Sequence, residues 1–337
     1  MAPMKPTRIE PSWASPDAPA DAASADSPGV PASAESSGVP AGADSSSAPA
    51  SADLGQNVAH APENIIEVTG LGNKFGAQVV HENLALNVRR GEVLAIIGGS
   101  GTGKSLLLRS IIGLQKPHTG QVRVLGVDMV QATPAEQAKV ARHWGVMFQD
   151  GALFSTLTVL ENIQLPIIEH QPLPVPLMQA IARLKIALVG LSPDAAGKIP
   201  SQLSGGMRKR VGVARALALD PEILFLDEPS SGLDPIGAAE LDSLLVTLKR
   251  SLDLTVVLIT HDLDSIYACC DRVAVLAEKR VIAIDTPARI SENPHPWIQA
   301  CFGGPRGRNA ASANSKITTD QPITTGEQDK PISAVRH

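Results

Sequence analysis

Cysteine is scarce in this chain of 337 residues, which contains only Cys269, Cys270 and Cys301. Because Cys269 and Cys270 are adjacent, they cannot form the usual disulfide with each other, and no cysteine spacing matches a metal-ligand motif. The scarcity argues against a disulfide-stapled fold and against a metal site built on cysteine. We therefore expect reduced, mostly buried thiols in a reducing compartment.

Long apolar runs and an excess of basic residues are also lacking. The longest apolar candidates, such as residues 254–259, have the length of strands and do not approach that of a membrane span. The N-terminus has no charged region followed by an apolar core, so we expect no secretory signal. The formal net charge of −5 argues against a nucleic-acid partner, because such proteins usually present a basic surface. We expect a cytosolic protein.

The two ends of the chain lack the residues that build a core. Residues 1–62 are dominated by Ala, Ser, Pro, Asp and Gly, with Trp13 as their only aromatic residue, and residues 305–337 contain no aromatic residue. Such segments bury too little apolar surface to offset their chain entropy. We therefore expect disordered extensions at both ends and one folded domain over residues 63–304, which is long enough for a sizeable core.

The most informative motif is a glycine-rich run, Gly98-Gly99-Ser100-Gly101-Thr102-Gly103-Lys104-Ser105. An apolar strand-like run precedes it and a helix-like run follows it, which is the setting that a phosphate-binding loop requires. Its backbone amides and the start of the following helix suit an anion with several charges. Lys104 would reach the β- and γ-phosphates of a nucleotide, and Ser105 would ligate Mg²⁺. The alternative is a glycine-rich turn between two buried elements.

The first half of the chain shows the periodicity of a mixed α/β fold. Before the glycine-rich motif we expect a strand at 65–68, a turn-rich patch over 70–76 and a half-exposed strand at 84–88. After the motif we expect a strand at 121–125, a helix from Thr133 to about Trp144, and a strand at 146–149. Thr133 is a suitable cap, and the proline after it suits the first helical position.

The second half begins with a mainly helical stretch, over about 150–219, that has no strong strand signal. Its helices are expected to open at Thr158, to cover 177–189, and to open again near Ser204; Thr158 and Glu161 have capping-box spacing. Beyond it, apolar strands at 223–226, 254–259, 273–276 and 281–284 alternate with helices at 235–252 and 261–271. This alternation implies a parallel sheet that is covered on both faces, with an antiparallel β layer at its edge.

Several weaker signals follow the phosphate-loop motif. Gln149 ends a strand, where its amide suits Mg²⁺ or an attacking water, although most such glutamines are surface residues. Ser204, Gly205 and Gly206 open a helix whose amides suit a phosphate; the alternative is an ordinary N-cap.

Acidic residues and a histidine also stand at strand ends. Asp227 and Glu228 end an apolar strand, where one carboxylate is placed for Mg²⁺ and the next for a water near a γ-phosphate. Asp234 lies in the turn that follows. His261 closes a second buried strand, where it would contact the γ-phosphate. The alternatives are a pair of solvated acids and a structural histidine.

Together these signals resemble the ABC-type ATPases in identity, order and spacing, from about Ile65 to Gly304. The resemblance implies a RecA-like parallel sheet with an antiparallel β layer and a helical subdomain at about 150–219. It implies ATP as substrate and Mg²⁺ held by Ser105, Gln149 and Asp227. It further implies a catalytic base at Glu228, a switch histidine at His261, an interface acid at Asp234 and an adenine-stacking aromatic at Phe75.

The same resemblance implies an assembly. Two copies would face each other head to tail, with each ATP between one chain's phosphate loop, 98–105, and the other chain's Ser204, Gly205 and Gly206. Opening and closing of this dimer would drive an integral-membrane permease docked near Gln149 and the helical subdomain. The protein would then lie on the cytoplasmic side of the inner membrane, attached through the permease.

One subgroup matches more closely. The form Leu-Ser-Gly-Gly-Met at 203–207, with the runs at 148–154 and 227–236, resembles the ATPases of the MCE-associated (Mla-type) phospholipid transporters of double-membraned bacteria. That subgroup implies an MCE-domain protein and often a small STAS-domain protein as partners. It also implies phospholipid transport between the inner and outer membranes, which maintains outer-membrane asymmetry. We expect Arg208, Lys209 and Arg210 to form a solvated helix face.

Two alternatives stay open. The first is the ATPase of an ABC importer or exporter for another solute, because this subunit contacts no transported molecule and its motifs do not decide the cargo. The second is a soluble ABC ATPase of DNA repair or translation. Such proteins usually have two nucleotide domains in one chain or a long coiled-coil insertion, and this sequence shows neither.

Overall fold

The computed structural model describes residues 63–170, 172–304 and 310. The extension expected at 1–62 lies outside the described residues, as does the tail expected at 305–337 apart from residue 310. Within the described ranges, no helix combines the length and the apolar character needed to cross a membrane.

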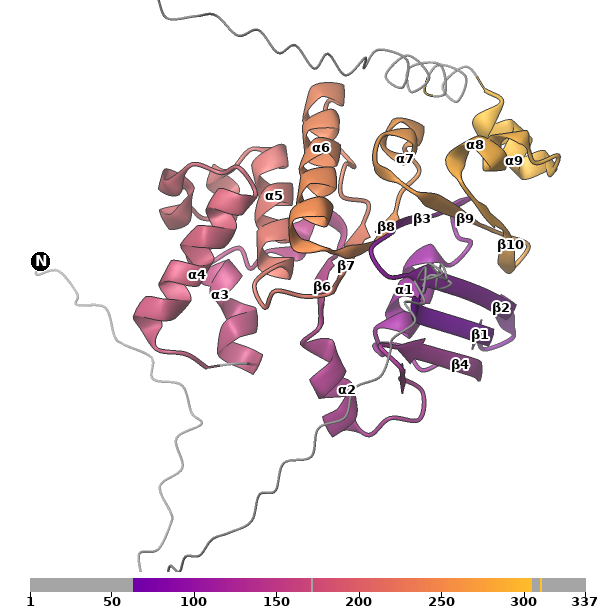
Figure 1. Ribbon diagram of the computed structural model, residues 1–337, viewed down its shortest axis with the longest axis horizontal. Helices are drawn as coiled ribbons and strands as arrows, with labels where there is room; N and C mark the ends of the chain where they lie inside the picture. Colours follow the sequence, from indigo (N-terminus) through magenta and orange to yellow (C-terminus); the bar gives the residue numbers. More distant parts are fainter. Residues whose placement is uncertain (1–62, 171, 305–309, 311–337) are drawn as a thin grey trace, which may run out of the picture. The chain divides into compact units, whose positions relative to one another are not determined.

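A six-stranded sheet forms the centre of the domain, in the order β10-β9-β3-β8-β7-β6 (Figure 1). The strands from β9 to β6 are parallel, and β10 is antiparallel to β9. The central strands β7 and β8 are buried along their whole length, because both faces of the sheet are covered. This confirms the expected parallel sheet, and β10 is an antiparallel addition. The bounds are β3 (Val93–Gly98), β6 (Trp144–Met147), β7 (Ile223–Asp227), β8 (Thr255–Ile259), β9 (Arg272–Ala277) and β10 (Arg280–Asp285).

A second, antiparallel sheet has the order β2-β1-β4-β5. The helix α1 (Lys104–Ile111) shares one apolar core with this sheet and with one face of the central sheet. The antiparallel layer is therefore joined to the phosphate-loop motif through α1, and it confirms the expected β layer. The bounds are β1 (Asn64–Phe75), β2 (Gln78–Arg89), β4 (Thr119–Val124) and β5 (Val127–Asp128).

Bulges distinguish β1 and β2 from the expected elements. A turn was expected over 70–76, but residues 70–75 belong to β1, which continues to Phe75 through register shifts. That expectation is therefore wrong for these residues. Gly70, with φ of 62°, allows one of these register shifts, since a left-handed backbone favours glycine. Leu71 of β1 pairs with Leu84 of β2, and Asn73 of β1 pairs with His81 of β2. Two residues of β1 therefore span three of β2, so β2 contains one extra residue at this point.

The opposite face of the central sheet is covered by helices, as Figure 1 shows. Residues of α5 and α6 form one core with β7 and β8, while α7, α8 and α9 form another with β3 and β9. The sequence analysis missed α8 and α9, although each has a capping residue followed by proline. The bounds are α5 (Gly205–Ala216), α6 (Pro235–Leu252), α7 (Leu263–Cys269), α8 (Pro287–Glu292) and α9 (Pro296–Phe302).

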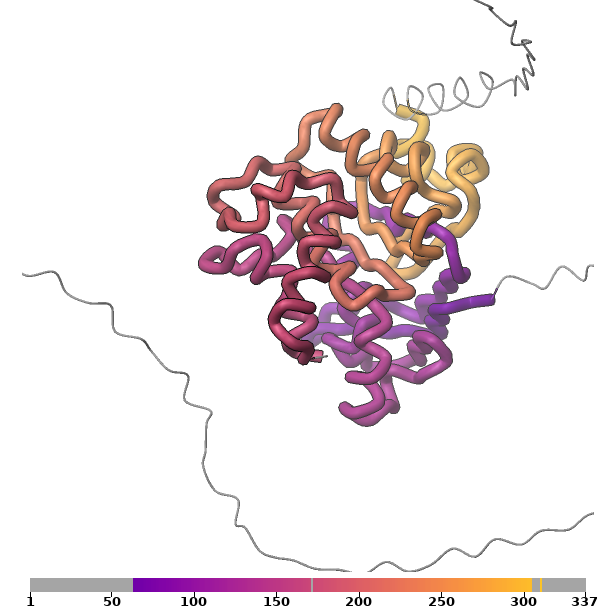
Figure 2. Tube along the Cα trace, turned by 60° about the vertical axis from the view of Figure 1, so that its left-hand side comes forward, coloured from indigo at the N-terminus to yellow at the C-terminus, as the bar shows by residue number. Residues whose placement is uncertain are grey.

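The described residues between Gln149 and Ala216 form helices, 3-10 turns and loops that lie together in Figure 2. Here α3 (Val159–His170) and α4 (Val175–Leu188) pack with α5. The expected capping box is present before α3, where Thr158 and Glu161 exchange hydrogen bonds. Near the antiparallel sheet, α2 (Pro134–Ala141) begins after the expected cap Thr133 but ends before Trp144, which starts β6.

Candidate functional site

The candidate site lies along one edge of the central sheet. Because β3, β8, β7 and β6 are parallel neighbours, their carboxyl ends meet at this edge. The phosphate-loop motif follows β3, His261 follows β8, Glu228 follows β7, and Gln149 follows β6 by two residues. The topology thus brings together four motifs that are separated by up to half of the sequence.

The phosphate-loop motif has the geometry of an anion-binding turn. Gly103 has φ of 93° and directly precedes α1, whose start has no side-chain cap, so its amides are free to bind an anion. Lys104 Nζ lies 2.9 Å from the carbonyl oxygen of Gly98 and 3.1 Å from that of Gly99. A Cβ at Gly98 would come within 2.4 Å of the Leu276 carbonyl oxygen, so this position needs glycine.

An acid–histidine pair closes β7 and β8. Glu228 Oε2 lies 2.8 Å from His261 Nδ1, and the glutamate side chain is 18% exposed while the histidine side chain is 74% exposed. The backbone of Glu228 is left-handed, with φ of 52°, and its N–H donates to the Ile259 carbonyl oxygen over 2.9 Å. The backbone therefore fixes the position of the carboxylate, which can accept a proton at the mouth of the site.

The turn that carries Gln149 is held by α5. Gln149–Ala152 is a kinked turn in which Asp150 and Gly151 have left-handed backbones, with φ of 58° and 75°. Gly151 packs closely against Gly212 of α5, where a Cβ would lie 3.0 Å from the Gly151 Cα. The Arg215 guanidinium donates to the carbonyl oxygens of Gly151 and Ala152 over 2.7 and 2.8 Å. The helix therefore fixes the backbone of the turn.

The expectation that Lys209 lies on a solvated helix face is wrong. Its side chain is buried, with the residue 4% exposed. Lys209 Nζ lies 3.4 Å from Asp150 Oδ1, 3.3 Å from the Glu228 carbonyl oxygen and 3.3 Å from Ser231 Oγ. One ammonium group thus connects the Gln149 turn to the backbone that carries Glu228. By contrast, Arg208 is exposed as expected.

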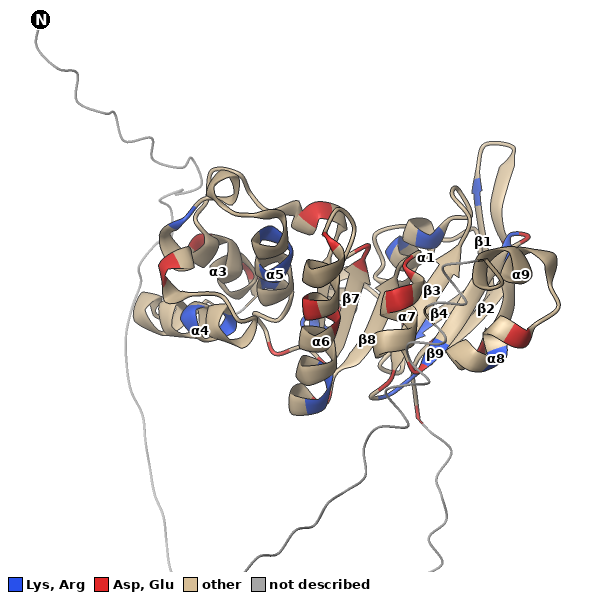
Figure 3. Cartoon of the chain, turned by 90° about the horizontal axis from the view of Figure 1, so that it is seen from above, with Lys and Arg blue, Asp and Glu red and all other residues tan. Residues whose placement is uncertain are grey.

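The helix start at Ser204 lies away from the phosphate-loop motif in the same chain. Ser204 Oγ accepts from the Met207 N–H over 3.2 Å, so it is an N-cap, and Asp234 caps α6 in the same way through Gly237. A cavity of about 710 Å³ lies beside Gly205, Gly206 and Asp234. Figures 1 and 3 show α5 and α1 on either side of the β7–β8 region.

Two aromatic residues flank the site, Phe75 from the antiparallel sheet and Trp297 from α9 on the opposite face of the central sheet. Phe75 ends β1, and the residue is 55% exposed, so it is open to contact. The sequence analysis missed Trp297, because this residue is part of no recognised motif. The indole Nε1 of Trp297 would lie 3.5 Å from a Cβ at Gly99. Trp297 on α9 therefore borders the start of the phosphate-loop motif.

The residues expected to hold Mg²⁺ supply the right kind of atoms. Ser105, Gln149 and Asp227 offer a hydroxyl, an amide and a carboxylate oxygen, and Mg²⁺ prefers oxygen ligands. All three lie at the carboxyl edge of the central sheet, Ser105 in the first turn of α1 and Asp227 at the end of β7. The donor set fits the ion.

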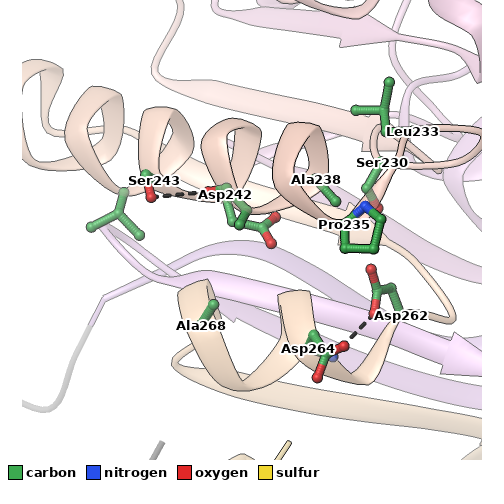
Figure 4. Close-up of a pocket in the computed structure, with 11 residues that line it drawn as sticks. Ser230, Leu233, Pro235, Ala238, Asp242, Ser243, Asp262, Asp264 and Ala268 are labelled. Atoms are coloured by element: carbon green, nitrogen blue, oxygen red, sulfur yellow. Dashed lines mark hydrogen bonds between the residues drawn. The ribbon is translucent and has the colours of Figure 1, made fainter. Parts of the chain in front are cut away.

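Behind the site, α6 and α7 border a cavity of about 540 Å³ (Figure 4). Asp242 of α6 is buried there, and Asp262 and Asp264 belong to the facing segment. Burial raises the pKa of Asp242 to about 6, the two neighbouring carboxylates act in the same direction, and a hydrogen bond from Ser265 opposes them. Figure 4 shows Asp242 on α6 and, facing it, Asp262 and Asp264 at the start of α7.

Asp242→Asn is expected to stabilise the protein at neutral pH. The folded state holds the Asp242 proton more tightly than the unfolded state. The contribution of Asp242 to folding stability therefore falls as the pH rises from 3.8 through about 6. At roughly 1.4 kcal/mol for each tenfold change in proton affinity, the ionisation of Asp242 lowers the free energy of unfolding by at most about 3 kcal/mol. Thermal unfolding from pH 4 to 8 should show a higher midpoint for the variant above pH 6 and a flatter profile. Asp264→Asn, at an exposed carboxylate, is the control, and an unchanged profile for Asp242→Asn would contradict the prediction.

Comparison with known proteins places this chain in a family. The chain matches the family described as "ABC transporter" over residues 81–231. It is 37% identical over 241 residues to the "Probable ribonucleotide transport ATP-binding protein mkl" of Mycobacterium tuberculosis, covering 72% of this chain and 67% of that protein. It is 38% identical over 231 residues to the "Intermembrane phospholipid transport system ATP-binding protein MlaF" of Haemophilus influenzae, covering 68% and 87%.

A solved structure agrees with this placement. The dimeric, post-hydrolysis state of the ATP-binding cassette MJ0796, bound to ADP and Pi, aligns with a TM-score of 0.61 and 31% identity, covering 66% of this chain and 98% of that one. The chain therefore belongs to the ABC transporter ATP-binding proteins, and it is an ATPase. More particularly, it is the ATP-binding subunit of an ABC transporter.

Proposed function

We propose that this subunit powers phospholipid transport between the inner and outer membranes and so maintains outer-membrane lipid asymmetry. The observation that carries the proposal is the match to a relative named for intermembrane phospholipid transport, which extends over 87% of that relative. The Leu203–Met207 form of the signature, with methionine in its last position, supports the same subgroup. The protein would lie on the cytoplasmic side of the inner membrane, attached through a permease.

The proposed chemistry uses the residues at the sheet edge. ATP binds with its phosphates on the Gly98–Ser105 loop, where Lys104 and the α1 amides neutralise charge, and its adenine stacks on Phe75. Ser105, Gln149 and Asp227 would hold Mg²⁺, which neutralises phosphate charge when bound. Glu228 accepts a proton from the attacking water. His261, paired with Glu228 through Nδ1, orients the carboxylate and contacts the γ-phosphate.

The proposed active form is a head-to-tail dimer. Within one chain, Ser204, Gly205 and Gly206 lie away from the phosphate loop, and they border an open cavity together with Asp234. A second copy would bring these amides over the ATP of the first, with Asp234 at the interface. The structure of the similar cassette MJ0796 is named as dimeric and bound to ADP and Pi, which supports a dimeric active form.

The proposed partners are an integral-membrane permease, an MCE-domain protein and a small STAS-domain protein, with no nucleic acid. A second candidate function is transport of another solute, because a relative of similar identity is named for ribonucleotide transport. Phe154 is an exposed residue beside the Gln149 turn, so it is placed to contact the permease.

The test is affinity purification of the tagged protein from detergent-solubilised membranes, with mass spectrometry of the proteins and lipids recovered. A permease, an MCE-domain protein and bound phospholipid are the expected result. A permease with a solute-binding protein would keep the ATPase and overturn the phospholipid cargo. Recovery of no membrane partner, in a preparation that hydrolyses ATP, would overturn the transport function altogether.

A variant pair sharpens this test. Phe154→Asp is expected to reduce recovery of the permease about 10-fold or more, since a buried aromatic anchor contributes about 2 kcal/mol or more to a protein interface. Leu252→Asp, at the end of α6, is the matched control and should recover the permease as the wild type does. Equal recovery with both variants would show that the permease docks elsewhere.

A further inference from the structure

His81 lies directly behind the phosphate loop. It belongs to β2 and is 1% exposed. A Cβ at Gly103 would come within 2.4 Å of His81 Nε2 and 2.6 Å of Val80 Cγ1. The imidazole therefore packs against the backbone of the last glycine in the loop, which must lack a side chain for this contact to exist.

A buried polar network holds the other side of the imidazole. Asn73 Nδ2 lies 3.1 Å from His81 Nδ1 and 2.9 Å from Ser110 Oγ, and Ser110 Oγ lies 3.0 Å from the Leu106 carbonyl oxygen. Asn73, His81 and Ser110 are all buried. The network therefore connects both long strands of the antiparallel sheet to α1, the helix that begins at the phosphate loop.

The network assigns the proton on the imidazole. A carbonyl oxygen only accepts, so the Ser110 hydroxyl donates its hydrogen to Leu106 and accepts from Asn73. The Asn73 atom in this position is then its NH₂ group, which donates its second hydrogen to His81 Nδ1. Neutral His81 consequently carries its own proton on Nε2, the atom that faces the loop.

This donor is unusual among the described residues. Among the buried side-chain nitrogen and oxygen atoms of the described residues, His81 Nε2 is the one that makes no hydrogen bond. An unpaired buried donor destabilises a fold. Burial lowers the pKa of His81, while the backbone acceptors of Thr102 and Gly103 raise it by less. The ring is thus neutral near pH 7, with its free N–H directed at the backbone of these two loop residues.

We propose that His81 is a positioning residue for ATP binding, whose Nε2–H faces the Thr102–Gly103 backbone and holds it in the conformation that binds the phosphates. The donor sets the last turn of the loop and ties it to the antiparallel sheet, which also carries Phe75. This inference rests on the proposed role of Gly98–Ser105 as the nucleotide site. A histidine that only fills the core would pack against the loop without changing its affinity.

Three substitutions separate the two roles in the full-length chain. Glutamine can place an amide N–H where Nε2 lies, asparagine reaches only the Nδ1 position, and leucine has neither group. The dissociation constant for adenylyl-imidodiphosphate with Mg²⁺ is expected to rise about 10-fold in His81→Leu and His81→Asn, as for loss of one hydrogen bond. His81→Gln should recover affinity to within about 3-fold of the wild type.

Controls identify which step fails. His118→Leu, at an exposed histidine after α1, should bind as the wild type does. Lys104→Ala should lose binding; if it binds normally, the nucleotide site itself is misassigned. If Lys104→Ala loses binding but His81→Leu does not, or if His81→Gln binds no better than His81→Asn, the role of His81 is overturned.

A measurement on the unaltered protein covers the case in which the His81 variants do not fold. Long-range ¹H–¹⁵N spectra of the histidine-labelled chain report the protonated ring nitrogen directly. A neutral ring with its proton on Nε2, whose shift moves when adenylyl-imidodiphosphate and Mg²⁺ are added, is the expected result. A proton on Nδ1, a doubly protonated ring, or a signal unmoved by the nucleotide would overturn the proposal.

Discussion

Glu228→Gln is expected to bind ATP as the wild type does and to hydrolyse it about 10²–10⁴-fold more slowly, the range for loss of a general base. The substitution keeps the shape of the side chain and one oxygen, but the amide cannot take a proton from water. The Glu228 N–H donates to the Ile259 carbonyl oxygen and its carboxylate pairs with His261. Because these contacts within the described part of the chain do not involve Lys104, ATP binding should be preserved.

Glu222→Gln is the matched control for this experiment. Glu222 precedes β7 and Glu228 follows it, so the two glutamates lie at opposite ends of one strand. Glu222 pairs with Arg90, with Oε2 and Nη1 2.6 Å apart, and lies away from the phosphate loop. Steady-state phosphate release and nucleotide binding should both be near wild type in this variant. Near-normal phosphate release in Glu228→Gln itself would rule out Glu228 as the base.

The sequence predicted the site because its motifs stand at strand ends. A continuous apolar run predicts a buried parallel strand, and the carboxyl ends of parallel strands share an edge. The residues that follow β3, β7 and β8 therefore meet at one edge of the sheet. The order of strands in the sheet supplied the rest: β8 lies between β3 and β7, which places His261 between the phosphate loop and Glu228.

His81 was beyond sequence reasoning because a bulge reverses the alternation of β2. Leu84, Leu86 and Val88 face the core, and a strict period of two would turn His81 toward solvent. Asn83, with φ of 48°, accommodates an extra residue, so His81 points inward as well. The period of hydrophobic residues does not reveal such an insertion, and the register with β1 appears only in the fold.

Lys209 was misassigned for a different reason. A run of three basic residues after a helix start is typical of a solvated face. However, α5 approaches the Gln149 turn unusually closely, because Gly212 of the helix faces Gly151 of the turn. The face of α5 that carries Lys209 is thereby covered by the segments that hold Asp150 and Ser231. Close helix–turn packing of this kind depends on both partners and cannot be seen in either segment alone.

The second large effect is expected from Lys209→Met, which should lower ATP turnover about 10- to 100-fold, since a displacement of about 1 Å at a catalytic group has an effect of this size. The ammonium group holds the carbonyl oxygen of Glu228, Ser231 Oγ and Asp150 together. Without it, the left-handed backbone at Glu228 keeps only the Ser231 N–H, at 3.3 Å, as a donor to its carbonyl oxygen, and the carboxylate is less well fixed. Nucleotide affinity should change by less than about 3-fold, because the described contacts of Lys209 do not include the phosphate loop.

Lys185→Met distinguishes loss of positioning from loss of stability. Lys185 of α4 is also a buried lysine that pairs with an exposed aspartate, Asp220, but it lies in the helical part of the fold away from the sheet edge. Both variants replace a buried ammonium group whose carboxylate partner is exposed, so neither leaves a buried charge unpaired, and the two should change the thermal midpoint by a similar, small amount. Only Lys209→Met should lower turnover when both are assayed well below their midpoints, and Lys209→Arg should recover part of it. Equal turnover in the two methionine variants would show that Lys209 supports the fold and not the position of Glu228.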